Sequence, residues 1–311
     1  MPPSQAPDLS REKRVLSSSI TMGALLGVFV PYLLFLLPAP LAVLIARHGL
    51  RAGITTAAVS AVAVGIATWH PLTALMVLLV LGLGVTIGEA LRDGLSLRQT
   101  LLIGWLVMII TQLLPYYAAS SLLGFDIVAE TERLWLQNMQ KALEFGGQTV
   151  TEQQVAETAN QVKTVFPAMI ILSAGFLTLV NYWLTRRWMR QLGAEIRAIP
   201  PFSRWRFPGY FAWAYILGLG CELLQQYVDI PVLESLSTNL QLVAGTILMM
   251  QGLALAWAYL ARLRTPKLLI AVVLVIASVM LPYLMQVFIL IGLLDTWFDL
   301  RRIGRKRAEK A

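Results

Sequence analysis

Long apolar stretches, separated by short polar segments, run along almost the whole chain. Several of them approach the roughly 20 residues that a helix needs to cross the hydrocarbon core of a bilayer. The uninterrupted stretches cover residues 52–69, 71–91, 101–117, 168–184, 210–224 and 240–260. This pattern predicts an all-α fold, a polytopic bundle of transmembrane helices.

Prolines break two further apolar stretches, residues 20–46 and 268–298. The residue before a proline is biased away from helix, so we expect the first stretch to divide at Leu37, within the proline cluster at 31–40. If both stretches double back, the chain has about ten membrane segments; if neither does, it has about eight. A helix over residues 268–280 would be about 20 Å long, against a hydrocarbon core of roughly 30 Å. The short segments are therefore either complete crossings or re-entrant ones.

Basic residues favour the larger number of segments. Lys and Arg are enriched in the cytoplasmic loops of membrane proteins. When both broken stretches double back, only Arg133, Lys141 and Lys163 of the 25 Lys and Arg fall on the opposite side from all the others. We therefore predict about ten membrane segments, with both termini in the cytoplasm.

Residues 123–166 differ in character and lie outside the bilayer in this topology. Acidic residues outnumber basic ones there, and apolar residues recur at helical spacing on either side of Gly146 and Gly147. The segment predicts an extracytoplasmic amphipathic helical hairpin. The chain then divides into a polar cytoplasmic tail (1–19), an N-terminal membrane bundle (20–122), the hairpin (123–166), a C-terminal membrane bundle (167–300) and a basic cytoplasmic tail (301–311).

Composition narrows the class of protein further. The chain is 57% hydrophobic and 14% charged, with a formal net charge of +8. In a soluble domain this charge would suggest nucleic acid, but the loops of a membrane protein account for the excess of basic residues. We therefore expect no nucleic-acid partner. Cys221 is the sole cysteine, which excludes an intrachain disulfide and a cysteine-built zinc site, and we expect neither a metal nor a cofactor.

Amide side chains inside the apolar stretches mark a first candidate site, because a polar group is costly in hydrocarbon unless it is paired or wetted. Asn181, Gln241 and Gln251 are amides of this kind. They allow two interpretations: hydrogen bonds between neighbouring helices, or a polar cavity that admits a small neutral or weakly charged solute. The sequence leaves both open.

Charged residues on the predicted cytoplasmic side form a second candidate site. Asp295 and Asp299 share a helix face at the end of the last apolar stretch, with Arg302 close to Asp299. They can hold a cation, dock a basic residue of a partner, or form salt bridges at the bilayer edge. Contact with lipid headgroups or a protein partner is predicted for the arginines of the longest basic loop, Arg186, Arg187, Arg190, Arg204 and Arg206.

Small residues recur four positions apart in several apolar stretches, as in Gly84 and Gly88 or in Gly252 and Ala256. Such strips let helix backbones approach closely, and here they predict tight packing within the chain. No phosphate-binding loop, HExxH motif or GxSxG motif occurs in the sequence. We therefore expect a protein that is not an enzyme.

A resemblance to the YybS-like family of bacterial integral membrane proteins rests on two stretches: LPAPLAVLIARHGLRAGI from Leu37 to Ile54, and GLLDTWFDLRR from Gly292 to Arg302. The resemblance extends over most of the chain and implies a location in the bacterial cytoplasmic (inner) membrane. The family brings no catalytic residues. The N-terminal half, with its short proline-bounded segment leading to Arg and Gly, also looks like the substrate-binding S component of energy-coupling-factor vitamin transporters.

These features favour two functions. One is a transporter-like membrane protein that binds a small solute, with the hairpin over the cavity and a cytoplasmic partner at the basic loops; it predicts a polar pocket. The other is a non-catalytic scaffold or assembly factor, whose hairpin and basic loops bind an envelope protein, anionic lipid or a cytosolic partner. The second function predicts a helix bundle without a water-accessible polar pocket. The sequence does not separate them.

Overall fold

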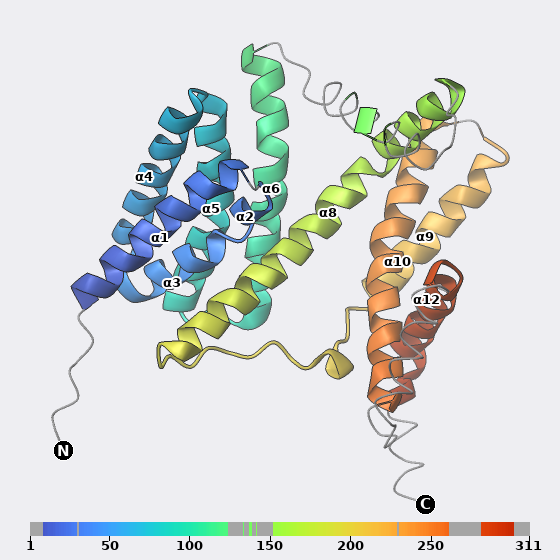
Figure 1. The fold of residues 1–311 in the computed structure, drawn as a ribbon. Coiled ribbons are helices and arrows are strands. Elements are labelled where there is room, and N and C mark those ends of the chain that lie inside the picture. Colours follow the sequence, from blue (N-terminus) through green and yellow to red (C-terminus); the bar gives the residue numbers. More distant parts are fainter. Residues whose placement is uncertain are drawn as a thin grey trace, which may run out of the picture. The chain divides into compact units, whose positions relative to one another are not determined.

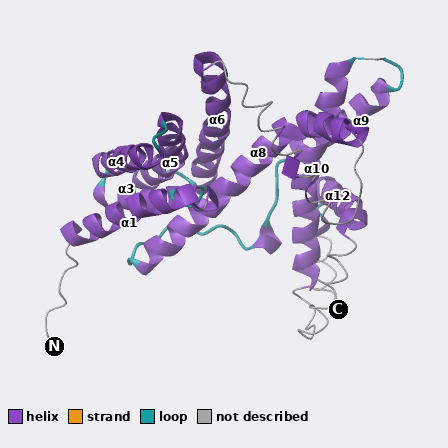
Figure 2. Cartoon of the chain, turned by 45° about the horizontal axis from the view of Figure 1, so that its top comes forward, coloured by secondary structure: helices purple, strands orange, loops and turns teal. Residues whose placement is uncertain are grey.

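A computed structural model of the chain describes residues 9–29, 31–123, 152–228, 230–260 and 281–301, with four isolated positions between 133 and 141. The regular structure in these ranges is helical, and Figure 2 shows no strand among them. The chain forms two compact units. Unit 1 comprises residues 1–148 and 170–199, and unit 2 comprises residues 149–169 and 200–311. The predicted all-α fold is therefore confirmed for the described residues.

Each unit has its own set of helices (Figure 1). Those of unit 1 are α1 (Leu9–Phe29), α2 (Pro31–Leu34), α3 (Pro38–His48), α4 (Leu50–Thr68), α5 (Pro71–Arg92), α6 (Leu97–Leu123) and the larger part of α8 (Glu152–Gln191). Unit 2 holds the start of α8, the 3-10 turn η1 (Phe202–Arg204), α9 (Tyr210–Gln225), α10 (Pro231–Leu260) and α12 (Leu281–Phe298).

Among the described residues, five helical segments are long and apolar enough to cross a membrane. They cover residues 50–68, 71–92, 97–115, 160–191 and 232–260. Helices of this length and composition fit a multi-pass membrane protein. The total of about ten membrane segments stays a prediction.

The first apolar stretch doubles back, as its prolines predict. α3 begins at Pro38, directly after Leu37, where the sequence placed the division. Near the start of α1, Glu12 pairs with Arg47 at the end of α3, so the two helices run antiparallel. α1 itself begins at Leu9, inside the segment expected to be a polar tail, because the pair with Arg47 gives its first turns a partner on α3.

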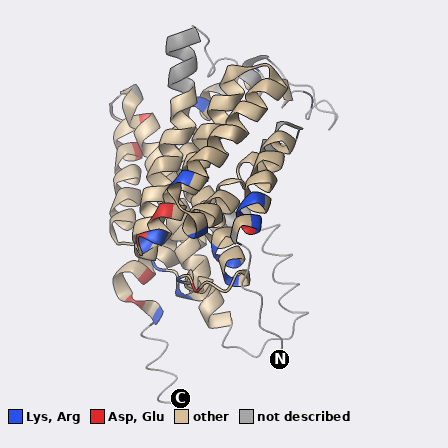
Figure 3. Ribbon diagram, turned by 90° about the vertical axis from the view of Figure 1, so that its left-hand side faces the viewer, with Lys and Arg blue, Asp and Glu red and all other residues tan. Residues whose placement is uncertain are grey.

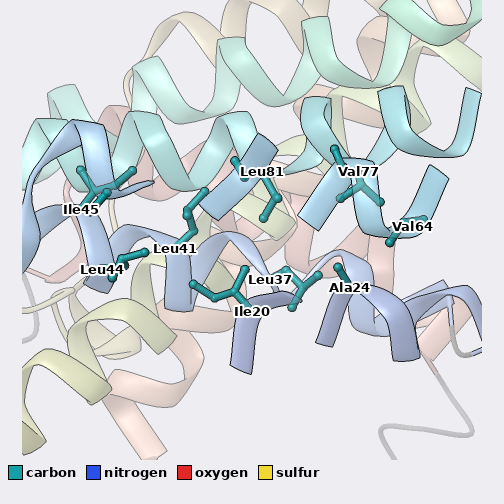
Figure 4. Close-up of a cluster of buried hydrophobic side chains, with 12 residues drawn as sticks. Ile20, Ala24, Leu37, Leu41, Leu44, Ile45, Val64, Val77 and Leu81 are labelled. Carbon is teal, nitrogen blue, oxygen red and sulfur yellow. The ribbon is translucent and has the colours of Figure 1, made fainter. Parts of the chain in front are cut away.

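α3 is the central helix of unit 1. Its residues 41–45 are at most 1% exposed. Apolar side chains of α1, α4 and α5 pack around them, and Figure 4 shows this cluster. α1 and α4 are also joined by paired hydroxyls, Ser17 with Thr56 at 2.9 Å and Thr21 with Ser60 at 3.1 Å. Such pairs satisfy polar side chains between helices that lipid cannot solvate.

Glycines allow close approach between helices in both units. A Cβ on Gly84 of α5 would lie 2.5 Å from the carbonyl oxygen of Pro38 at the start of α3. In unit 2, a Cβ on Gly252 of α10 would overlap the Phe288 carbonyl of α12, and one on Gly292 would overlap a carbonyl of α10. The prediction that these small residues pack within the chain is confirmed.

α8 runs unbroken through Pro167, whereas the sequence predicted a boundary after residue 166. A proline removes a backbone donor, and its ring displaces the preceding turn. In unit 2 the side chain of Asn239 on α10 takes the place of a backbone hydrogen bond next to this proline. Its Oδ1 accepts from the Ala168 N–H at 2.7 Å, and its Nδ2 donates to the Thr164 carbonyl at 2.7 Å. These two backbone groups would bond each other in a regular helix, so the amide replaces the missing hydrogen bond.

The rest of the predicted hairpin, residues 123–151, lies outside the described residues apart from Leu123 and the isolated positions. Its arrangement outside the bilayer therefore stays a prediction.

α10 and α12 lie parallel in unit 2. Gly252 and Gly292, each in the second half of its helix, are in contact. Near their ends, the Tyr259 hydroxyl donates to the Leu300 carbonyl at 3.0 Å. Parallel neighbours fit a last apolar stretch that crosses twice. Residues 261–280 lie outside the described residues, so the extra crossing stays a prediction.

Basic residues lie together at one end of the unit 1 helices (Figure 3). Arg47 at the end of α3 donates to the carbonyl of Leu192, just past α8, at 3.3 Å. The Arg92 guanidinium at the end of α5 lies next to Gly49. The ends of α3, α5 and α8, which the charge pattern assigned to one side, are thus neighbours. That this side is cytoplasmic stays a prediction.

Candidate functional site

A break between two helices lies inside unit 1. α2 ends at Leu34 and α3 begins at Pro38. With 11 residues, α3 is about 16 Å long, which is far shorter than a hydrocarbon core of roughly 30 Å. Pro38 packs against Gly84, near the middle of the 22-residue α5. Because α5 is long enough to span the bilayer, the break lies near the mid-depth of unit 1.

A side chain of α8 stabilises this break. Proline has no N–H to donate to the preceding turn, so the proline-rich segment leaves carbonyl groups without their helical donors. Asn181 Nδ2 donates to the Phe35 carbonyl at 2.8 Å and to the Leu177 carbonyl of its own helix at 2.9 Å. The nitrogen of this amide therefore forms a hydrogen bond between helices, which is one of the two interpretations that the sequence left open.

The side-chain oxygen of Asn181 has no such role. The residue is 0% exposed, and among the described residues its Oδ1 has no hydrogen-bond partner. Both bonds of Nδ2 go to carbonyl oxygens, which can only accept, so the orientation of the amide is set by its neighbours. A buried acceptor without a partner costs about 1–3 kcal/mol. A donor from a bound molecule would therefore be favourable at this position.

Apolar surface is accessible beside the break. Leu33 and Leu36 are 39% and 38% exposed, whereas Leu37 is 8% exposed. The break thus combines exposed apolar side chains with one buried acceptor. Small-molecule sites are typically built from mainly apolar walls and a few well-placed polar groups.

The other two amides predicted to line a solute cavity belong to unit 2. Gln241 Nε2 donates to the Glu222 carboxylate at 2.7 Å. Gln251 lies further along the same helix, α10, about 15 Å away at 1.5 Å per residue. Gln251 is 2% exposed. Gln241 and Gln251 are therefore not brought together in unit 2, and Asn181 is the one predicted amide of the three in unit 1.

Gln251 instead joins the acidic pair at the end of α12. Its Nε2 lies 3.3 Å from Asp295 Oδ2. The Asp295 side chain is 0% exposed, and its Oδ2 lies 3.3 Å from Arg301 Nε. Asp299 pairs with Arg206. Two carboxylates face two guanidinium groups, so the arrangement favours salt bridges at the bilayer edge over a cation site.

The sequence named Arg302 as the basic member of this cluster, but Arg301 is the residue that reaches Asp295. Asp299 follows the end of α12 and has a positive φ of 43°. The chain therefore leaves the helical path there, and helical spacing no longer tells which arginine returns to the cluster. Arg302 lies outside the described residues.

The same cluster fixes the segment that precedes α9. Arg301 donates to the carbonyls of Ser203 and Trp205 at 2.7 and 2.8 Å. The Phe207 N–H donates to Gln251 Oε1 at 3.0 Å. This short segment, residues 200–207, has little regular structure of its own, so side chains of α10 and the end of α12 determine its path.

The five arginines predicted to contact lipid or a partner fall into two groups. Arg186 donates to a backbone carbonyl of its own unit at 3.3 Å, and Arg206 pairs with an aspartate. These two stabilise the protein's own fold. Arg187, Arg190 and Arg204 are exposed, so a lipid or partner can reach them. Arg206 is exposed as well, although its guanidinium is paired with Asp299.

Sequence reasoning missed Asn239 and Arg301. The signal for the first was Pro167 inside an apolar stretch, which requires a replacement donor and acceptor from a neighbouring helix. The sequence could not show which helix that is. The signal for the second was only the abundance of arginines after residue 300.

An all-helical chain with several apolar helices of membrane-spanning length is an integral membrane protein by class. The chain matches the family described as "Predicted membrane protein (DUF2232)" over residues 17–296, and it belongs to this family. It is 25% identical over 304 residues to the uncharacterized protein YybS of Bacillus subtilis (strain 168), covering 93% of this chain and 96% of that protein. The resemblance to the YybS-like family is therefore confirmed. No solved structure matches the chain significantly.

Proposed function

We propose that the protein is a transporter-like, non-catalytic membrane protein that binds a small neutral or weakly charged solute at the helix break of unit 1. The observation that carries this proposal is the buried Oδ1 of Asn181, which has no hydrogen-bond partner in the part of the chain that the structure describes and lies beside a break near mid-depth. In many secondary transporters, discontinuous helices form the substrate site near the middle of the bilayer, where freed backbone groups and side chains bind polar solutes.

The chemistry of the break limits the solute. Oδ1 requires an N–H or O–H donor, and the exposed faces of Leu33 and Leu36 require an apolar portion. Asn181 is uncharged and cannot neutralise a full charge on the solute, so its site suits a neutral or weakly charged donor. The resemblance of the N-terminal half to transporter S components supports the same class of function. In this proposal the protein lies in the bacterial inner membrane with both termini cytoplasmic, and a cytoplasmic partner supplies the energy.

Retention of a small molecule by the purified protein tests the proposal. The full chain is purified in a mild detergent, and bound small molecules are identified by mass spectrometry, beside the variants Asn181→Leu and Gln241→Leu. We expect Asn181→Leu to retain about five- to tenfold less of one solute, since one neutral hydrogen bond is worth about 1 kcal/mol. Gln241→Leu, which removes an amide of unit 2, should retain it fully. No solute above an empty-micelle control, or equal retention by Asn181→Leu, contradicts the proposal.

A scaffold or assembly factor is the second candidate, and the fixed segment before α9 favours it. Arg301 and Gln251 hold this segment with Arg204 exposed, which presents a basic group in a defined place. Cross-linking in intact membranes, followed by mass spectrometry, tests this function. A protein cross-linked to the wild type but lost with Arg204→Gln, together with unchanged solute retention, would favour the scaffold.

A further inference from the structure

We infer that one face of α8 in unit 1 is a binding site for an anionic phospholipid, with Arg187 and Arg190 at the phosphate and Phe176 and Trp183 along the acyl chain. This site is separate from the proposed solute site. Asn181 points from α8 to the helix break, whereas residues two positions further along a helix point to nearly the opposite side.

The four residues form one continuous stripe. Positions 176, 183, 187 and 190 are separated by seven, four and three residues, which places them on the same face of a helix. Phe176 and Trp183 are 66% and 47% exposed, and Arg187 and Arg190 are exposed. All four positions lie in residues 160–191, which are long and apolar enough to cross a membrane, and the two arginines are near the end of this segment. The stripe therefore faces acyl chains and ends in two guanidinium groups.

The Trp183 ring holds the guanidinium of Arg187 in a position where it can bind a lipid headgroup. Arg187 Cζ lies 5.7 Å from the centroid of the Trp183 ring. This cation–π contact holds the guanidinium at the level of the indole, and indoles in membrane proteins prefer the headgroup region. Arginine binds phosphate through paired N–H groups. The stacked Arg187 thus has its donors held where a phospholipid phosphate lies.

Other arginines of the same loop do not continue this stripe. Arg186, one position away, is turned inward and donates to the Ile196 carbonyl. Arg197 and Arg206 are exposed, but they lie beyond the end of α8. Arg204 of unit 2 is exposed, but it lies in the turn η1 and does not continue an apolar helix face. Charge without adjoining apolar surface suits a soluble anion or a protein, whereas charge at the end of an apolar stripe suits a lipid.

Lipid retention in nanodiscs tests this site. The full chain is reconstituted with phosphatidylcholine alone or mixed with phosphatidylglycerol, and lipids that remain bound are counted by native mass spectrometry. Each basic residue near an anionic surface is worth about 1 kcal/mol, or about fivefold in affinity. We expect Arg187→Gln and Arg190→Gln each to lower phosphatidylglycerol retention about fivefold, and Trp183→Leu to lower it about two- to fivefold. Retention of phosphatidylcholine should not change.

Arg197→Gln is the matched control, because Arg197 is exposed but lies beyond the end of α8 and off the stripe. It should change phosphatidylglycerol retention less than about twofold, because a lone exposed charge is weakly coupled to any one lipid. Circular dichroism of every variant reports whether the helices remain intact. Equal phosphatidylglycerol retention by the Arg187→Gln/Arg190→Gln double variant overturns the inference. So does displacement of the lipid by inorganic phosphate alone, which would indicate a site for soluble anions. Loss of a cross-linked protein with no change in lipid retention would show a protein-binding surface instead.

Discussion

Each unit contains a helical region with proline, where an asparagine from a neighbouring helix bonds to the backbone. The two asparagines differ in how many atoms of the side-chain amide form hydrogen bonds. In unit 2, Asn239 uses both atoms: Oδ1 accepts from Ala168, and Nδ2 donates to Thr164. In unit 1, Asn181 uses only Nδ2, and Oδ1 stays buried without a hydrogen-bond partner among the described residues.

The difference separates a structural role from a binding role. A buried amide that satisfies both a donor and an acceptor stabilises the fold and has nothing left for a ligand. A buried amide with one unused acceptor costs stability in the absence of a ligand. Proteins commonly accept such a cost at functional sites. If unit 1 binds a solute as proposed, equivalent substitutions in the two units should have opposite patterns of effect.

The largest expected loss of stability is at Arg301 in unit 2. Arg301→Gln leaves the Asp295 carboxylate, whose side chain is 0% exposed, without its closest charge partner. Breaking a buried ion pair in this way costs about 3–5 kcal/mol, measured as the free energy of unfolding in mixed micelles by circular dichroism. Asp295→Asn combined with Arg301→Gln should recover part of this loss. The folded fraction of Arg301→Gln should still retain the solute at Asn181. If folded protein lost the solute, the proposed difference between the two units would be contradicted.

Asn239→Ala is expected to cost about 2–3 kcal/mol, because it leaves the Thr164 carbonyl and the Ala168 N–H unpaired in the interior. The matched experiment places the same change in a Pro167→Ala background. There the helix can close its own hydrogen bond from residue 168 to residue 164, so the cost should fall by at least half. An equal cost in both backgrounds would show that the amide does not act through the proline break.

Two glycines on α5, Gly84 and Gly82, test the close packing of α5 against the helix break in unit 1. Gly84→Ala puts a methyl group against the Pro38 carbonyl, whereas the matching position at Gly82 has open space. We expect Gly84→Ala to destabilise by about 2 kcal/mol through overpacking and to lower solute retention by displacing the break. Gly82→Ala should be neutral or stabilise by about 0.5 kcal/mol. Thermal unfolding of both variants provides the measurement, and similar losses for the two would argue against close packing at Gly84.

Substitution of Asn181 is expected to cost less stability than substitution of Asn239 or Gly84. Asn181→Leu removes the hydrogen bond to the Phe35 carbonyl, but it also removes the unpaired acceptor, so the net cost should be about 1 kcal/mol or less. The same variant is expected to lose the solute. A stability loss as large as that of Asn239→Ala, with no change in retained solute, would show that Asn181 has only a structural role. The proposed difference between the two units would then be wrong.

Much of the fold could be predicted because it follows from local chemistry. Pro38 and the residues around it marked the division of the first apolar stretch, and α3 begins there. Gly84 and Gly252 marked close helix contacts, which the structure contains. Each of these predictions needs only the backbone limits of proline or the missing side chain of glycine. Those limits apply wherever the residue lies in the fold.

The candidate sites could be predicted only in part. The sequence identified Asn181 as costly in hydrocarbon, and the structure shows which of its two side-chain atoms remains unused. It grouped Gln251 with Asn181, but Gln251 bonds to Asp295 on a neighbouring helix of unit 2. The choice of partner for a polar side chain depends on which helix faces are neighbours, and helical periodicity within one segment carries no information about that.

The sequence by itself determined that this protein is a helical membrane protein, because the length and polarity of each apolar stretch decide whether it enters a bilayer. Only the tertiary structure decided that Asn239 forms hydrogen bonds through both side-chain atoms at Pro167, while the Oδ1 of Asn181 has no partner among the described residues. Residues distant in the sequence compete for the same few hydrogen-bonding groups in the interior, and the packing of the helices determines which of those groups are left over.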